Sequence, residues 1–193
     1  EILDGKALSI RLNRAMKKRV DGVSRAPGLA VVLVGSDAAS EVYVGMKGRV
    51  AHRIGFHHHQ ISVAANTTLS ALLEIVDELN QDPTIDGILV QLPLPKHLDT
   101  MAVMDRIHPS KDVDGFCAIN SGFLGQGRPN LVPCTPWGVM RLLDETGISL
   151  SGLNAVVIGR SNIVGRPMAQ LLEQANCTVT VCHSRTRDVA DKI

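Results

Sequence analysis

The sequence has few aromatic residues, no marked excess of either charge and no long apolar run. Of its 193 residues only 3% are aromatic, and 20 Lys and Arg stand against 19 Asp and Glu, which gives a net charge of +1. This balance offers no electrostatic basis for binding nucleic acid or an anionic membrane. The longest apolar runs, such as Leu29–Val34, are as long as a strand and far shorter than the ~18 residues of a membrane span. We therefore expect no nucleic-acid partner and no membrane partner.

Paired cysteines and a secretory signal are missing as well. The four cysteines form no C-x-x-C pair, and the N-terminus has no apolar segment followed by a small-residue cleavage site. This pattern is typical of a reducing compartment, so we expect free thiols and a cytoplasmic location. Three consecutive histidines, His57–His59, suggest a metal site, but neighbours on a strand point to opposite faces and cannot converge on one ion. We predict no metal site.

What the sequence does contain is a regular alternation of helical and strand periods. A helical pattern over 5–24 precedes Leu29–Val34, a continuous apolar, β-branched run of the kind that is buried on both faces of a parallel sheet. Ser40 is expected to cap the next helix. Strands are predicted at 56–63, 87–91, 155–159 and 178–182, and helices at 69–79, 99–107, 136–146 and 165–176. Strands separated by helices predict βαβ units, and hence an α/β fold with parallel sheets.

Composition divides the chain into two regions. Residues 108–135 are rich in Gly, Pro, Asn and Ser and are too long for an idle connection, which predicts a functional loop. We expect an N-terminal parallel-sheet domain over 1–135 and a Rossmann-type domain over 136–193. The 43 residues after position 150 are too few for two βαβαβ halves. The Rossmann domain is therefore expected to be incomplete, in a truncated or partly recorded chain.

Two short patterns in the first region are candidates for chemistry. Tyr43 and Lys47 are four residues apart, so on a helix their side chains lie on one face, where a phenol and an amine can share a proton. Gln91 ends a predicted strand ahead of Leu92–Pro95, at the carboxyl end where parallel sheets present ligands. Taken alone, the first pattern is more often a solvated helix face that carries both residues by chance, and a glutamine that merely caps a strand is the alternative for the second.

A glycine turn opens the second region. Gly159 and Gly165 bracket a segment between a strand and a helix, where backbone N–H groups and the helix N-terminus can hold a phosphate. At the end of the next strand, where NAD enzymes place an acidic residue, the chain has Ser184 and Arg185, and Arg160 lies in the turn. Cationic and hydroxyl groups without a carboxylate favour a 2′-phosphate, and hence NADP over NAD. Ordinary surface arginines are the alternative interpretation.

Five motifs occur in order along the chain: Ser40–Lys47 (SEVYVGMK), Asp86–Pro95 (DGILVQLPLP), Pro109–Phe116 (PSKDVDGF), Pro133–Pro136 (PCTP) and Gly159–Pro167 (GRSNIVGRP). Together they resemble the bifunctional methylenetetrahydrofolate dehydrogenase/methenyltetrahydrofolate cyclohydrolase family, of the bacterial FolD type, over essentially the whole chain. The resemblance implies a homodimeric enzyme that oxidises 5,10-methylenetetrahydrofolate with NADP. It then hydrolyses the methenyl product to 10-formyltetrahydrofolate.

The resemblance also implies roles for individual residues. By position, Lys47 matches the catalytic lysine, Tyr43 its aromatic partner and Gln91 the amide that contacts the lysine. Asp114 matches the carboxylate that binds the pterin ring, so Tyr43, Gln91 and Asp114 form the implied substrate-binding set. The implied cofactor segment consists of Gly159, Arg160, Ser161, Gly165, His183, Ser184 and Arg185. A neutral amide suits an amine that passes protons near neutral pH, because a carboxylate would hold the ammonium charged.

Two alternatives stay open at this point. The family's C-terminal segment, with its Pro-Gly-Gly-Val-Gly-Pro run, is absent from these residues, so a non-catalytic folate-binding or dimerisation fragment is one alternative. Another NADP-dependent two-domain dehydrogenase, such as one acting on shikimate, also fits the glycine turn. It does not explain the set of Tyr43, Lys47, Gln91 and Asp114.

Overall fold

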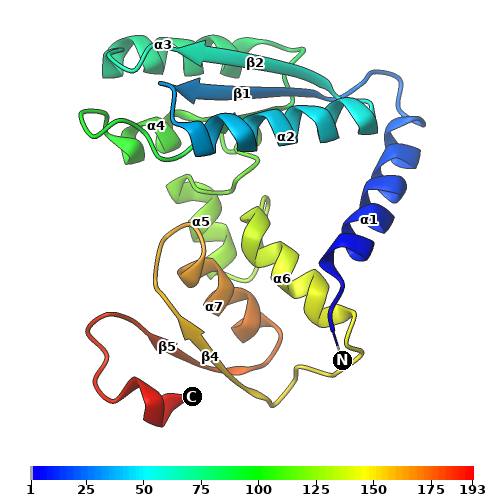
Figure 1. Cartoon of the computed structure of the whole chain (residues 1–193), viewed down its shortest axis with the longest axis vertical. Coiled ribbons are helices and arrows are strands. Elements are labelled where there is room, and N and C mark those ends of the chain that lie inside the picture. The colour runs from blue at the N-terminus through cyan, green and yellow to red at the C-terminus, as the bar shows by residue number, and fades with distance from the viewer. Residues whose placement is uncertain (1) are drawn as a thin grey trace. The chain divides into compact units, whose positions relative to one another are not determined.

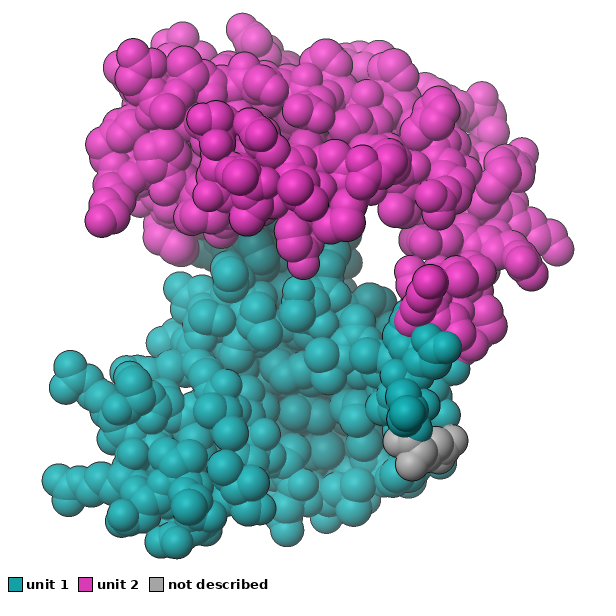
Figure 2. All heavy atoms as spheres, viewed as in Figure 1, with its two compact units in different colours: residues 1–5, 114–193 teal, residues 6–113 magenta. Residues whose placement is uncertain are grey.

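The computed structural model describes residues 2–193 and divides into two compact units (Figure 1, Figure 2). Unit 2 comprises Lys6–Val113, and unit 1 comprises Asp114–Ile193 together with the start of the chain through Gly5. Each unit combines helices with a parallel sheet, which confirms the predicted fold class. The predicted domain boundary between residues 135 and 136 stays a prediction. No helix within residues 2–193 has both the length and the apolar character that crossing a membrane requires.

Unit 2 is built around a three-stranded parallel sheet with the strand order β2-β1-β3 (Figure 1). The central strand β1 lies between the other two, with Val31 opposite Gln60 of β2 and opposite Leu89 of β3. In chain order the elements are α1 (Gly5–Val20), β1 (Gly28–Val34), α2 (Ala38–Ile54), β2 (His57–Val63), α3 (Leu69–Gln81), β3 (Gly87–Val90) and α4 (Thr100–Arg106).

Strand β1 is buried on both faces, as its continuous apolar run predicts. Val31 and Leu33 pack with Val44 of α2 in one cluster, while Ala30 and Val32 alternate onto the opposite face and are fully buried there. Helices α3 and α4 pack against each other and add fully buried apolar side chains to the core of this unit. The sheet of unit 2 is therefore a rigid support for the segments that leave its strands.

Helix α2 begins behind Asp37, so the expectation that Ser40 caps this helix is wrong. The Asp37 carboxylate accepts hydrogen bonds from the backbone N–H and the hydroxyl of Ser40, each at 2.8 Å. Ser40 lies in the first turn as the donor, because the acceptor of an N-cap stands about three residues before the N–H that it satisfies. These two bonds, the backbone one first, lower the pKa of Asp37.

Asp86 links the segment that leads into β3 to the segment that leads into β1 through hydrogen bonds. Its carboxylate accepts two hydrogen bonds from the Arg25 guanidinium, at 2.7 and 3.0 Å, and one from the backbone N–H of Gly28 at 2.7 Å. These contacts lower the pKa of Asp86, with the Arg25 hydrogen bond as the largest cause.

Unit 1 is built around two parallel strands. Helix α7 packs on both strands, and α5 and α6 pack against α7 (Figure 1). The buried core joins Leu124 of α5 and Val157 of β4 to Met168, Leu171 and Leu172 of α7. The elements are α5 (Ala118–Gly125), α6 (Cys134–Asp144), β4 (Asn154–Ile158), α7 (Gly165–Gln174), β5 (Thr178–Cys182) and a short 3-10 helix η1 (Val189–Lys192). Helix α5 lies inside the stretch 108–135, for which the sequence predicts only a loop.

The sheet of unit 1 is covered on one face. Val157 is buried in the core with the α7 side chains, whereas its neighbours Val156 and Ile158 alternate onto the other face, and Ile158 is 68% exposed. Trp137, the only tryptophan of the sequence, lies on α6 and is about half exposed. The described part of unit 1 therefore leaves some apolar side chains of β4 exposed.

Candidate active site

The side chains of Lys47 and Gln91 meet, although 44 residues separate them in sequence. The Lys47 Nζ donates a hydrogen bond to the Gln91 Oε1 at 3.0 Å, and both side chains are half-buried. The Gln91 Nε2 donates in turn to the backbone carbonyl of Leu92 at 2.7 Å. This second bond fixes the orientation of the amide, with its oxygen toward the lysine.

Strand pairing explains why these two side chains meet. Strands β1 and β3 are parallel neighbours, so their carboxyl ends lie at the same edge of the sheet. The Gln91 N–H donates to the Val32 carbonyl at 2.8 Å and so extends the ladder one residue past β3. On α2, Val44 is buried against the β1 core three residues before Lys47. The anchored helix thus holds its lysine over the end of β3.

The aromatic ring of Tyr43 lies on the same face of α2 as Lys47, as the four-residue spacing predicts. The Lys47 Nζ is 6.0 Å from the centroid of the ring, at the outer limit of a cation–π contact. Tyr43 is 58% exposed, so its ring is open to an incoming flat molecule. Lys47, Gln91 and Tyr43 therefore form one group, which we call the lysine site.

One of the three consecutive histidines packs against the same helix α2. His58 of β2 packs against α2 at Gly48, where an added Cβ would lie 3.1 Å from the His58 Cε1. Burial, followed by the neighbouring His59, lowers the pKa of His58. The glycine directly after Lys47 is the sequence signal that could have indicated this close approach. Among residues 2–193, no group of three or more His, Cys, Asp or Glu side chains is arranged to hold a metal ion.

Asp114 is the first residue of the long segment that makes up most of unit 1. Two residues earlier, Asp112 forms a parallel bridge with Ile88, so the segment that leads to Asp114 runs beside β3. Gly115 follows with a φ of 65°, and an added Cβ there would lie 2.8 Å from the Leu131 carbonyl oxygen. The turn after Asp114 therefore requires glycine. The role of Asp114 in binding a pterin ring stays a prediction.

The glycine turn of unit 1 lies at the carboxyl end of β4. Gly159 has a φ of 126°, and its N–H donates to the Cys182 carbonyl at 2.7 Å. A Cβ on Gly165 would lie only 2.3 Å from the Gly159 carbonyl oxygen, so no other residue fits there. Ile158 pairs with Cys182 at the end of both strands, and so the turn and the segment His183–Arg185 leave the sheet at the same edge.

The hydrogen-bond donors of this turn differ from those of a simple helix N-terminus. The Ser161 hydroxyl accepts from the N–H groups of Val164 and Gly165 at 3.2 and 3.3 Å, and the Ser161 carbonyl accepts from Arg166 at 3.0 Å. Pro167 has no N–H. Within the described chain the backbone N–H groups of residues 160–163 make no hydrogen bond. The donors left for a phosphate therefore belong to the turn itself.

The segment after β5 is held by two local hydrogen bonds. The His183 N–H donates to the Thr186 Oγ1 at 2.8 Å, and the Arg185 N–H donates to the His183 Nδ1 at 3.2 Å. Arg160, Ser184 and Arg185 are exposed, and neither arginine side chain forms an ion pair with a residue that the structure describes. Open N–H groups and exposed guanidinium groups at one sheet edge fit the phosphates of a dinucleotide.

Two family profiles match the chain. The profile described as "Tetrahydrofolate dehydrogenase/cyclohydrolase, catalytic domain" matches residues 3–114. The profile described as "Tetrahydrofolate dehydrogenase/cyclohydrolase, NAD(P)-binding domain" matches residues 133–193.

Individual relatives give the same result. "Bifunctional protein FolD 2" of Roseobacter denitrificans is 51% identical over 196 residues, a match that covers this whole chain and 65% of the relative's length. The structure of the bifunctional FolD dehydrogenase/cyclohydrolase of Campylobacter jejuni is similar with a TM-score of 0.97 and 43% identity, over this whole chain and 70% of the other. The FolD of Trypanosoma brucei, complexed with NADP and an inhibitor, is similar with a TM-score of 0.95 and 36% identity, over this whole chain and 68% of the other.

Proposed function

Because the chain belongs to the tetrahydrofolate dehydrogenase/cyclohydrolase family, we propose that it carries out both reactions of that name. It oxidises 5,10-methylenetetrahydrofolate with NADP, and it hydrolyses the methenyl product to 10-formyltetrahydrofolate. The observation that carries this proposal is the hydrogen bond from the Lys47 Nζ to the Gln91 Oε1, with the amide held by the Leu92 carbonyl. An amine beside a fixed neutral acceptor is a suitable proton-transfer group.

In the hydrolysis, Lys47 is the group that moves the proton. A water molecule adds to the methenyl carbon and loses one proton, the remaining hydroxyl proton moves to N5 as the bond from the carbon to N5 breaks, and the formyl group stays on N10. Gln91 holds the amine through one hydrogen bond and carries no charge, so it does not oppose loss of the proton as a carboxylate would. The amide cannot turn its NH₂ group toward the lysine without giving up the bond to Leu92.

Tyr43 and Asp114 are assigned to substrate binding, together with Gln91. The open ring of Tyr43 suits stacking against the aromatic part of a folate, and it lies beside the amine that acts on the reacting carbon. A carboxylate at Asp114 offers two acceptor oxygens to the donor edge of an aminopyrimidine. Two contacts of different kinds orient the substrate as well as bind it.

NADP binding is assigned to the sheet edge of unit 1, at Gly159, Arg160, Ser161, Gly165, His183, Ser184 and Arg185. When bound, NADP supplies the acceptor for the hydride. The open N–H groups of the turn suit its phosphates, and the exposed Arg160 and Arg185 suit a 2′-phosphate. The NADP complex of the Trypanosoma brucei relative supports the same choice of cofactor.

The proposal extends to organisation and setting. Residues 1–135 serve as the folate-binding catalytic domain and residues 136–193 as part of the cofactor domain, a division supported by profile matches over 3–114 and 133–193. The protein acts as a homodimer in the cytoplasm, on tetrahydrofolate derivatives.

The test is an assay that resolves both products. The purified chain receives methylenetetrahydrofolate with NADP, and methenyl and formyl products are followed over time. Lys47→Met is expected to lose formyl production by at least about a hundredfold, because it removes the amine of the lysine site. Lys18→Met, which removes an exposed lysine of α1, is the matched control and keeps both rates.

Two results would overturn the proposal. Unchanged formyl production in Lys47→Met would remove the lysine from the mechanism. A parent chain that binds folate but turns over neither substrate would favour the non-catalytic folate-binding alternative.

A further inference from the structure

Helix α1 is strongly basic in a chain that is almost neutral overall. It carries six Lys and Arg residues and no Asp or Glu, whereas the net charge of the whole sequence is +1. Lys17, Lys18 and Arg19 lie in the last turn, where cations complement the helix dipole. Arg14 lies before that turn, so the dipole does not account for it.

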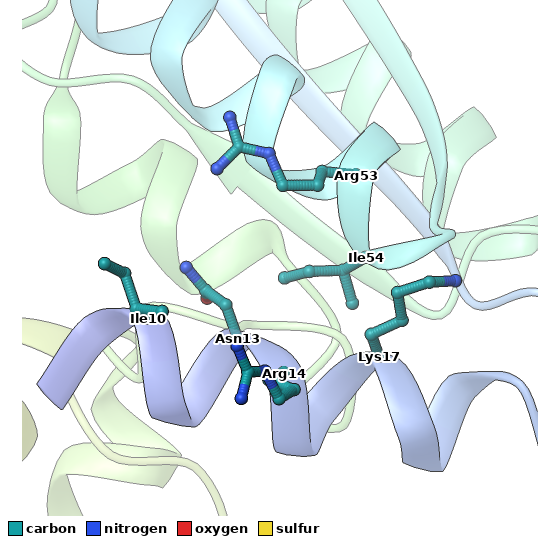
Figure 3. A pocket seen from close by; sticks show the side chains of 6 residues that line it. All are labelled: Ile10, Asn13, Arg14, Lys17, Arg53 and Ile54. Atoms are coloured by element: carbon teal, nitrogen blue, oxygen red, sulfur yellow. The ribbon is translucent and has the colours of Figure 1, made fainter. Parts of the chain in front are cut away.

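Some of these basic residues line a cavity in unit 2. It has a volume of about 240 Å³ and lies between α1 and the last turn of α2. Figure 3 shows Asn13 and Lys17 reaching up from α1, Arg53 extending from α2 across from them, and Ile54 between the two helices. Its lining residues are Ile10, Asn13, Arg14, Lys17, Arg53 and Ile54. We call it the α1–α2 cavity.

Two of the three cations at the α1–α2 cavity lack a partner. Lys17 donates to the Asp21 carboxylate at 2.9 Å, and Asn13 makes a 3.5 Å hydrogen bond to the Ser9 hydroxyl. The guanidinium groups of Arg14 and Arg53, by contrast, form no hydrogen bond and no ion pair with any residue from 2 to 193. Cations that line one cavity without a carboxylate repel each other, and a bound anion removes that repulsion.

We propose that the α1–α2 cavity binds a small metabolite that carries a phosphate group. A guanidinium group matches phosphate oxygens in a two-pronged geometry, and the residues that line this cavity include one arginine from each helix. Ile10 and Ile54 supply an apolar wall for the carbon part of such a molecule. The volume lies below the roughly 300–1,000 Å³ of pockets for drug-sized ligands, which favours a small phosphate ester over a dinucleotide.

This inference is independent of the proposed function. None of the cavity residues belongs to the lysine site or to the glycine turn of unit 1. A ligand here is therefore a second ligand, and its binding does not depend on either step of folate chemistry.

The test is a calorimetric titration of the full chain with inorganic phosphate, at constant ionic strength and with NADP present to fill the cofactor turn. The double variant Arg14→Gln/Arg53→Gln is expected to weaken the phosphate Kd at least tenfold. The double variant Lys18→Gln/Arg19→Gln removes the same charge from unit 2 outside the cavity, and it should change the Kd less than twofold. No saturable binding in the parent chain, or equal weakening in both double variants, would overturn the proposal.

Two further measurements locate the ligand and define its source. The side-chain amide resonance of Asn13 should shift with phosphate and saturate at the calorimetric Kd, whereas an unmoved resonance would contradict binding in this cavity. Butyl phosphate tests the apolar wall. Tighter binding of the ester than of inorganic phosphate identifies an organic phosphate, and equal binding identifies free phosphate. Circular dichroism of the variants verifies that each is folded.

Discussion

The two sheets of this molecule follow the same rule of parallel pairing but are covered differently. In unit 2 the central strand has a neighbour on each side, and its side chains are buried on both faces. In unit 1 two strands pair with each other, and α7 covers one face while Ile158 projects from the other. The strands β1 (GLAVVLV) and β4 (NAVVI) both consist mostly of apolar residues. The comparison shows that an apolar side chain on a strand is buried only where a helix covers that face of the sheet. The apolar pattern alone does not decide its burial.

The two candidate sites reflect the same difference. The lysine site consists of side chains. The elements that carry these side chains pack against β1, a strand that is buried on both faces. The glycine turn of unit 1 consists of backbone N–H groups, and its shape depends on the Gly159–Gly165 approach and on the Ser161 hydroxyl. Substitutions should therefore act on the first site through side-chain chemistry and on the second through backbone geometry.

The largest expected difference compares two isoleucines in strands. Ile88 in β3 is completely buried, and Ile88→Ala should lower the free energy of unfolding by about 2–5 kcal/mol, since it leaves a cavity in the core. Ile158 in β4 is 68% exposed, and Ile158→Ala should change the free energy of unfolding by no more than about 0.5 kcal/mol. Denaturant unfolding followed by circular dichroism measures both variants. Equal losses would mean that the open face of β4 is covered in solution, and would break the comparison.

A smaller effect is expected from two glycines in unit 1. Gly165→Ala forces a Cβ against the Gly159 carbonyl oxygen and should lower the free energy of unfolding by about 1–3 kcal/mol. It should also weaken NADP binding, because the turn must open. Gly138→Ala in α6 is the control, since a Cβ there meets nothing within 4 Å and alanine favours a helix by up to about 1 kcal/mol.

Unfolding curves and NADP titrations measure both glycine variants. NADP affinity unchanged by Gly165→Ala would show that the close approach of the two glycines is not needed for the cofactor.

The smallest expected effect is a pH dependence in unit 2. The folded pKa of Asp86 lies below its unfolded value of about 3.9, so the charged carboxylate stabilises the fold above that pH. This stabilisation is lost as the pH falls through the folded pKa. Asp86→Asn should therefore lose less stability than the parent chain between pH 5 and pH 2, in unfolding curves recorded across that range.

Glu78→Gln is the matched control for this titration, because it removes one negative charge from the same unit at an exposed position of α3. An equal change in both variants would show that net charge, and not the contacts of Asp86 with Arg25 and Gly28, sets the response to acid.

Much of the fold could be predicted from the sequence because each strand of both sheets carries a strong local signal. The strand predicted at 155–159 is found at Asn154–Ile158, and the helix predicted at 165–176 is found at Gly165–Gln174. The helix predicted over 5–24 ends at Val20, because the apolar spacing continues into a turn. Helix α5 was missed because its sequence AINSGFLG contains two glycines, and because its N-cap is the weak thiol acceptor of Cys117 rather than an oxygen.

Less of the candidate site than of the fold could be predicted from the sequence. The five motifs were enough to identify the family, and the profile matches confirm it. The meeting of Lys47 and Gln91 was implied by the resemblance, since no local pattern links residues 44 positions apart. The bond from Gln91 to the Leu92 carbonyl was not predictable, because it depends on how the backbone leaves β3. The role of Ser161 was missed for a similar reason: its hydroxyl reaches the N–H groups of α7 only after the turn has folded back.

Because aromatic residues are scarce, each unit has its own intrinsic fluorophore. The sequence has a single tyrosine, Tyr43, in unit 2 and a single tryptophan, Trp137, in unit 1, and both rings are about half exposed. Tryptophan emission therefore reports on unit 1 alone, and tyrosine emission reports on unit 2 at the lysine site.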